Sequence, residues 1–230
     1  MNRKALLKSL IIGTFCFLYV SVYSQSGTES YAQLIGNIEL KRSELKELYN
    51  NTNVQHQDSI LELARDYLFN TAVNEVFPYW YGTEWDFNGT TRVPGEGSIA
   101  CGYFVTNTLT DMGFKIPRIQ WAQSASEVFI TKLSVNVKRF SNVPVSTVRE
   151  YLRQSGKGLY LVGLDCHVGY LAVTDTNIRF IHSNYYHPEK GVMSEDIETD
   201  NPFKDSGYRV IGKLFGDGMM KKWILGESFH

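Results

Sequence analysis

A cysteine at the start of a predicted helix is the residue of this sequence best suited to nucleophilic chemistry. Ser98 is a typical N-cap residue, and the pattern after it predicts a helix that runs to Met112 and ends at Gly113. Cys101 then lies in the first turn, where free backbone N–H groups and the helix dipole stabilise a thiolate. The thiol also shares the apolar face of the helix, so it should point toward a sheet. A buried, inert cysteine is the alternative.

A histidine that can accept the thiol proton begins a predicted strand later in the chain. His167 starts an apolar strand at residues 167–173, and His182 lies on the next strand, residues 178–185. Residues 174–177 have the composition of a hairpin turn. If this turn has two or four residues, the two imidazoles lie on the same face of neighbouring strands, either paired directly or diagonal.

That hairpin predicts which group orients His167. We expect His182 in this role, because His187 has the opposite parity and precedes a proline, where a strand should break. A three-residue loop would turn His182 away and leave Asp165 or Asn184 as the orienting group.

A disulfide and a zinc site are the rival uses of these residues. Cys101 and Cys166 could form a bridge. Cys166 adjoins His167 on the predicted strand, however, so their side chains should point to opposite faces. This disfavours both the bridge and the ligation of one ion by the pair. Since no CxxC or HExxH spacing occurs, we expect neither a metal nor a cofactor.

Helices are predicted mainly before these strands. Residues 31–49 form an amphipathic pattern with Leu34, Ile38, Leu45 and Leu48, and Ser59 with Glu62 forms a capping box for a second helix that ends at Pro78. That second helix should bury Ile60, Leu63, Ala64, Tyr67, Leu68 and Ala72. A further helix is predicted at residues 146–155, and strands at 159–164, 167–173, 178–185, 191–197 and 208–215. This order predicts an α+β domain with an antiparallel sheet.

Together these motifs resemble the NlpC/P60 family of papain-like cell-wall peptidases. The resemblance covers residues 76–215. It rests on Tyr79-Trp80-Tyr81-Gly82-Thr83, Ala100-Cys101-Gly102-Tyr103-Phe104-Val105, His167-Val168-Gly169-Tyr170-Leu171 and Phe180-Ile181-His182-Ser183, with Gly191-Val192 and Tyr208-Arg209-Val210-Ile211 as the last two strands. The chain departs from the family at Ala100 and Gly102, where many members have Asp and Ser. Thr83 also replaces the second Gly of a Gly-Gly pair, and Ser155-Gly156-Lys157-Gly158 the usual Pro-Gly-Asp turn.

The resemblance implies a papain-like catalytic domain at residues 76–230, with helices packed on an antiparallel sheet of about five to six strands. Residues 25–75 would be N-terminal helices that pack on this domain or precede it. The implied activity is hydrolysis of amide bonds in peptidoglycan stem peptides, without metal or cofactor. Its catalytic residues would be Cys101 as nucleophile, His167 as base and His182 as the orienting group, with substrate-binding residues Tyr79, Tyr81 and Trp85.

The N-terminus predicts export through a cleaved signal peptide, residues 1–24. Three basic residues precede an apolar run at 10–23, and Val22 and Ser24 are small enough for the −3 and −1 positions of a cleavage site. The run is shorter than the roughly 20 residues that span a bilayer, and Phe15 before Cys16 argues against a lipoprotein. We expect a secreted or periplasmic monomer with a peptidoglycan peptide as its partner. Without a basic stripe, no nucleic acid is expected to bind.

Two other functions stay open. One is a cysteine peptidase or amidase that acts on another secreted peptide. The other is a catalytically silent module whose aromatic residues bind a peptide or glycan, with Tyr79, Trp80, Tyr81 and Trp85 as its wall. Fast alkylation of Cys101 by iodoacetamide would distinguish an enzyme with a thiolate from such a module.

Overall fold

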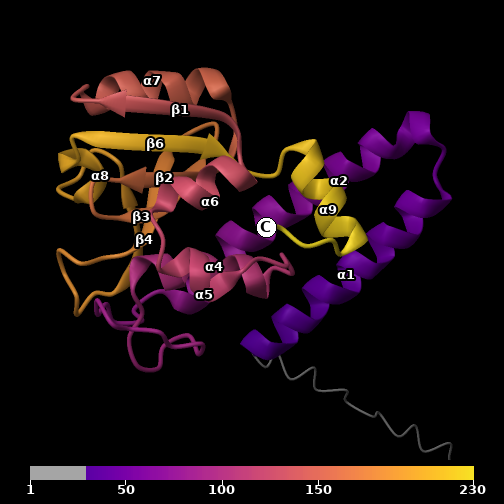
Figure 1. Ribbon diagram of the computed structural model, residues 1–230, viewed down its shortest axis with the longest axis horizontal. Helices are drawn as coiled ribbons and strands as arrows, with labels where there is room; N and C mark the ends of the chain where they lie inside the picture. Colours follow the sequence, from indigo (N-terminus) through magenta and orange to yellow (C-terminus); the bar gives the residue numbers. More distant parts are fainter. Residues whose placement is uncertain (1–29) are drawn as a thin grey trace, which may run out of the picture.

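We describe the protein from a computed structural model, in which residues 30–230 are placed. The predicted signal peptide, residues 1–24, lies outside these described residues. Within them, helices cover both faces of a six-stranded antiparallel sheet, as Figure 1 shows. The predicted α+β class and the expected number of strands are therefore confirmed.

The strand order of the sheet is β1-β6-β2-β3-β4-β5, and each neighbouring pair is antiparallel. The strands are β1 (Val135–Ser141), β2 (Gly158–Leu164), β3 (Val168–Val173), β4 (Ile178–Ser183), β5 (Val192–Asp196) and β6 (Tyr208–Lys213). The five predicted strands are all present. Strand β1 was not predicted, because this edge strand exposes most of its side chains and lacks an apolar alternation.

The hairpin between β3 and β4 has the four-residue loop that was one of the two expected forms. Val173 pairs with Ile178, so residues 174–177 form the loop. Continued along both strands, this register puts His167 and His182 in the diagonal relation. The predicted parity of His182 is therefore confirmed.

The two faces of the sheet bury two separate apolar clusters. One face packs against α4 (Cys101–Asp111) and α6 (Ser126–Leu133), with α5 (Arg118–Ala122) beside α4. The other face packs against α7 (Val145–Ser155), which is the helix predicted at 146–155, and against α8 (Pro202–Asp205). Because both faces are covered, β2 and β3 are buried along almost their whole length.

The N-terminal helices form a hairpin at one end of the sheet. Helices α1 (Tyr31–Asn51) and α2 (Gln57–Thr71) lie side by side, with α9 (Asp217–Leu225) packed against both (Figure 1). Their buried side chains join the same cluster as the α4 face of the sheet. Among residues 30–230, no helix is long and apolar enough to cross a membrane.

Three details of these helices differ from the prediction. Ser59 is not an N-cap, because α2 already begins at Gln57, and the Ser59 hydroxyl donates to the carbonyl of His56 at 2.6 Å. A capping box does occur in α1, between Ser30 and Gln33. Pro78 does not end the helix. The chain continues through a π-helical turn, Ala72–Val76, into α3 (Phe77–Trp80), whose first turn tolerates a proline.

Two leucines predicted to be buried face solvent instead. Leu48 is 49% exposed and Leu63 is 55% exposed, whereas Tyr49 and Leu61 take their places in the core. The packing of α1 and α2 against α9 selects a slightly rotated face of each helix, which a pattern within one helix cannot specify.

Candidate functional site

Cys101 is the first residue of α4 rather than the third. Ala100 is its N-cap residue, and Ser98 instead forms a β-bridge with Glu84. The Ser183 hydroxyl donates to the carbonyl of Ile99 at 2.7 Å, which ties this loop to strand β4. The segment before the helix is therefore held by strand-like contacts, and they aim the first turn of α4 at the end of the sheet.

Cys101 is half-buried and lines the wall of a cavity. Burial raises its pKa, and the backbone N–H groups of Val168 and Gly102 oppose that shift without overcoming it. Burial therefore opposes the resting thiolate that the helix start predicts, because desolvation of the charge outweighs the backbone N–H groups.

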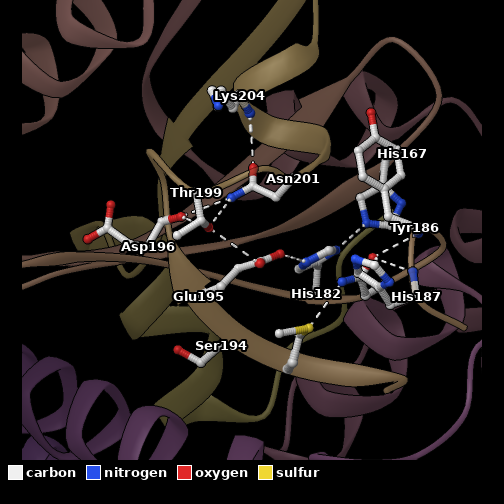
Figure 2. A network of polar contacts seen from close by, with 12 residues as sticks. His167, His182, Tyr186, His187, Ser194, Glu195, Asp196, Thr199, Asn201 and Lys204 are labelled. Carbon is white, nitrogen blue, oxygen red and sulfur yellow. Dashed lines mark hydrogen bonds and ion pairs between the residues drawn. The ribbon is translucent and has the colours of Figure 1, made fainter. Parts of the chain in front are cut away.

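His167 and His182 are in direct contact, as Figure 2 shows. Nε2 of His167 lies 2.9 Å from Nδ1 of His182, and the two rings are nearly perpendicular. Both side chains are buried. Nδ1 of His167 is also buried and has no hydrogen-bond partner among the described residues. His167 is therefore held through one nitrogen, and its other nitrogen makes no hydrogen bond within the described residues.

The alternative orienting groups are engaged elsewhere. The side chain of His187 is half exposed and pairs loosely with Glu189, at 4.0 Å. Asp165 accepts hydrogen bonds from Ser206 and from the backbone of Gly207, and the side-chain oxygen of Asn184 accepts from backbone N–H groups of its own loop. The structure thus brings His182, and not these groups, to His167.

A carboxylate that was not predicted from the sequence forms a hydrogen bond with the histidine pair. Oε1 of Glu195 lies 2.7 Å from Nε2 of His182, and the hydroxyl of Thr199 donates to Oε2 at 3.4 Å (Figure 2). Glu195 pairs in register with Phe180 on β4, and the ring of Phe180 stacks on His182. The available signal was an acidic residue on the following strand. Its register depends on the loop at residues 184–191, however, and the sequence does not specify that loop.

The pKa values of these groups follow from their burial. Burial, followed by the neighbouring His182, lowers the pKa of His167 well below its usual value, and burial lowers that of His182 to about 3. Burial raises the pKa of Glu195, against the opposing effects of Thr199 and nearby cations. Both imidazoles are therefore neutral at neutral pH, so the resting Cys101 and His167 are an uncharged thiol and an uncharged base.

An aromatic cavity of about 640 Å³ opens beside Cys101. Cys101 and His167 both line it, and its aromatic walls are Trp85, Phe87, Tyr103 and Tyr185. Among the described residues that line it, none is Asp, Glu, Lys or Arg. A second cavity, of about 410 Å³, shares Cys101 and His167 but includes Glu127 and Asp165. The thiol therefore lies between a neutral aromatic side and an acidic side.

Of the three predicted substrate-binding residues, only Trp85 lines the aromatic cavity. The ring of Tyr79 packs on that of Tyr31, with centroids 5.2 Å apart. Tyr81 lies beside Ser194 and Arg179, at the β4–β5 side of the sheet. Neither tyrosine reaches the cavity, because the chain turns at Gly82 between them and Trp85. Tyr185, whose ring centroid is 5.0 Å from that of His167, was not predicted.

Cys166 does not point away from the site as predicted. It is exposed and lines both cavities next to Cys101. The alternation argument does not apply, because β3 begins only at Val168 and Cys166 lies in the preceding bend. Both cysteines of the described chain are free.

Metal-ligating side chains do not gather in residues 30–230, where no group of three or more His, Cys, Asp or Glu is placed to hold an ion. Comparison of the chain with models of known families, with curated proteins and with solved structures gives no match. The function is therefore inferred from the site and from the motifs in the sequence.

Proposed function

We propose that this protein is a thiol hydrolase that cleaves amide bonds, with Cys101 as nucleophile and His167 as general base. One observation supports this most strongly. The free Nδ1 of His167 belongs to a ring whose Nε2 is held by His182, and that ring shares a cavity wall with the Cys101 thiol. A nucleophile, a base and a group that orients the base are the parts of a nucleophilic triad.

In the proposed reaction, Nδ1 of His167 removes the proton from Sγ of Cys101 as sulfur attacks the amide carbonyl. The carbonyl π pair moves to oxygen and gives a tetrahedral oxyanion. Its collapse breaks the C–N bond, and the His167 imidazolium returns the proton to the departing amine. Water then hydrolyses the thioester with His167 as base, which releases the acid and restores the thiol.

The start of α4 offers donors for the oxyanion. The first N–H groups of a helix have no intrahelical acceptor, so the N–H of Cys101 can donate to a tetrahedral oxygen at its own side chain. The N–H groups of Gly102 and Val168 lie at the same sulfur atom. These fixed dipoles stabilise negative charge that develops during attack, and they need no reorganisation.

The proposed fold type and substrate come from the motifs. The resemblance to NlpC/P60 peptidases implies a helix that begins at the nucleophile and a histidine directly before one strand that contacts a histidine on the next strand. A papain-like fold is proposed on that basis. The proposed substrate is a peptide amide of peptidoglycan, reached by export through the signal peptide. The aromatic cavity, which lacks Asp, Glu, Lys and Arg among its described lining residues, suits a neutral peptide or glycan portion of such a substrate.

The test is incubation of the mature protein with purified muropeptides, followed by mass analysis of the products. New amino groups should form with the wild type and with Cys166→Ser, and no product should form with Cys101→Ser. Release of reducing sugar without new amino groups would overturn the proposal, and so would full turnover by Cys101→Ser. Binding of muropeptides without cleavage would favour the silent module, and cleavage only of other peptides would favour the second enzyme function.

A further inference from the structure

Glu195 contacts the histidine pair at His182, and its own environment is unusual for a carboxylate. Its side chain is only 13% exposed, yet it forms no ion pair with Arg or Lys among residues 30–230. Its short contact is with Nε2 of His182, at 2.7 Å. Burial of a carboxylate is costly unless its hydrogen bonds compensate, so this contact requires an explanation.

The contact determines where the protons of both rings lie. An ionised carboxylate only accepts hydrogen bonds, so His182 must carry its proton on Nε2. A neutral imidazole has one donor and one acceptor nitrogen, so Nδ1 of His182 is then an acceptor. It receives the proton that His167 carries on Nε2, across 2.9 Å. Nδ1 of His167 is left with a lone pair.

We propose that Glu195 is a positioning residue that, through His182, keeps His167 in the one tautomer that can accept the thiol proton of Cys101. This inference rests on the proposed thiol hydrolase function. When His167 takes up the proton, its positive charge is also stabilised through His182 by the negative charge of Glu195.

Protonation of Glu195 reverses the direction of the hydrogen bonds between Glu195, His182 and His167. A carboxyl group that donates to Nε2 of His182 moves the His182 proton to Nδ1, and His167 must then accept on Nε2 and carry its own proton on Nδ1. In that state Nδ1 of His167, the nitrogen proposed to accept the thiol proton, is a donor and cannot act as a base. Ionisation of Glu195 is therefore a condition for activity.

Burial raises the pKa of Glu195, and the charged and polar groups around this carboxylate oppose that shift. Arg179, Lys190 and His187 face Glu195 with positive or potentially positive charge, and Thr199 donates to it. His167 is faced by His182 and by the ring of Tyr185. Among the described residues, Glu195 is the only carboxylate that forms a hydrogen bond or ion pair with His182.

The first test reads the tautomers directly and does not depend on activity. In the full chain with ¹⁵N-labelled histidine, nitrogen chemical shifts should show His167 and His182 both protonated on Nε2 at neutral pH. Acidification through the titration of Glu195 should move both protons to Nδ1. Protonation of His167 on Nδ1 at neutral pH would overturn the proposal, whether or not the protein proves to be a hydrolase.

The second test is Glu195→Gln, with Glu189→Gln as the matched control, because Glu189 is exposed and approaches only His187. Glu195→Gln should lower kcat at least about tenfold and leave KM nearly unchanged. In the pH profile of activity, it should also remove the acidic limb that is due to titration of Glu195. Glu189→Gln should behave like the wild type. A wild-type kcat and pH profile in folded Glu195→Gln would overturn the proposal. If that variant does not fold, Glu195→Asp takes its place: its shorter side chain should not reach His182, so kcat should still fall at least about tenfold, and a wild-type kcat would overturn the proposal.

Discussion

Gly102 and Ala122 bring two helices into backbone contact directly after the candidate nucleophile. A Cβ atom on Gly102 would lie 2.2 Å from the carbonyl oxygen of Ala122, so α4 and α5 could not keep this distance with any larger residue. The contact also accounts for Gly102 at a position where many NlpC/P60 peptidases, which the sequence resembles, have Ser. A serine after Cys101 would require α5 to move.

We therefore expect Gly102→Ala to lower the free energy of unfolding by about 1–3 kcal/mol, because the added methyl group overpacks the α4–α5 contact. Chemical denaturation measures the change. Gly36→Ala is the control, since Gly36 is exposed in α1 with nothing near its Cβ position, and it should instead stabilise the protein by about 0.5–1 kcal/mol. Equal effects of the two substitutions would contradict the packing interpretation.

Trp85→Ala should raise KM for the substrate by a few-fold to about tenfold and change kcat less, because the ring forms a wall of the aromatic cavity and packs against Tyr185. Steady-state kinetics on a defined muropeptide measures both constants. Tyr81→Ala is the control, since Tyr81 lies outside the cavity, and it should leave KM unchanged. A larger effect at Tyr81 than at Trp85 would place the substrate elsewhere.

The pH profile of kcat/KM should have a broad plateau. His167 must be neutral to act as base, and its pKa lies well below 6.5, while burial raises the pKa of the Cys101 thiol. Apart from the limb due to Glu195, activity should therefore stay level across neutral pH. A limb near neutral pH that persists in Glu195→Gln would indicate a resting thiolate–imidazolium pair instead.

Alkylation by iodoacetamide at neutral pH should be slower at Cys101 than at Cys166. Burial raises the pKa of Cys101 and leaves little thiolate, whereas Cys166 is exposed. This reverses the fast labelling expected from the sequence. Peptide mapping after short exposures gives both rates, and Cys166→Ser verifies the assignment. Preferential labelling of Cys101 at pH 7 would show that substrate is not needed to form the thiolate.

Stability should decrease as the pH falls below 6.5. Below this pH, His167 and His182 become protonated in the unfolded chain but stay neutral in the folded protein. Each of the two histidines should therefore reduce the free energy of unfolding by about 1 kcal/mol for every pH unit of acidification. For His182 this loss continues toward its folded-state pKa of about 3. Denaturant titrations between pH 6.5 and about 5 measure the slope.

Two variants check that slope. His182→Asn should flatten it, because one depressed pKa is removed, whereas His56→Gln should not, because the His56 side chain is exposed. Glu195 and Asp111 oppose the trend, since their raised pKa values favour the folded state as the pH falls through them. A pH-independent stability in the wild type would mean that the histidines are not buried in neutral form.

The sequence by itself determined which local elements form and which residues they carry. The apolar patterns predict five strands and the principal helices, because periodicity within a segment reports which of its faces is buried. The turn composition at residues 174–177 limits the parity of β3 and β4, and this is why His182 could be assigned as the neighbour of His167.

Only the tertiary structure decided how separate segments meet. It places Glu195 at His182 through a β4–β5 register that an irregular loop sets, and it moves Tyr79 and Tyr81 away from the cavity that Trp85 lines. It also buries the thiol of Cys101, which raises the pKa of this group. Burial and long-range register depend on what packs from other parts of the chain, and no pattern inside a single segment contains that information.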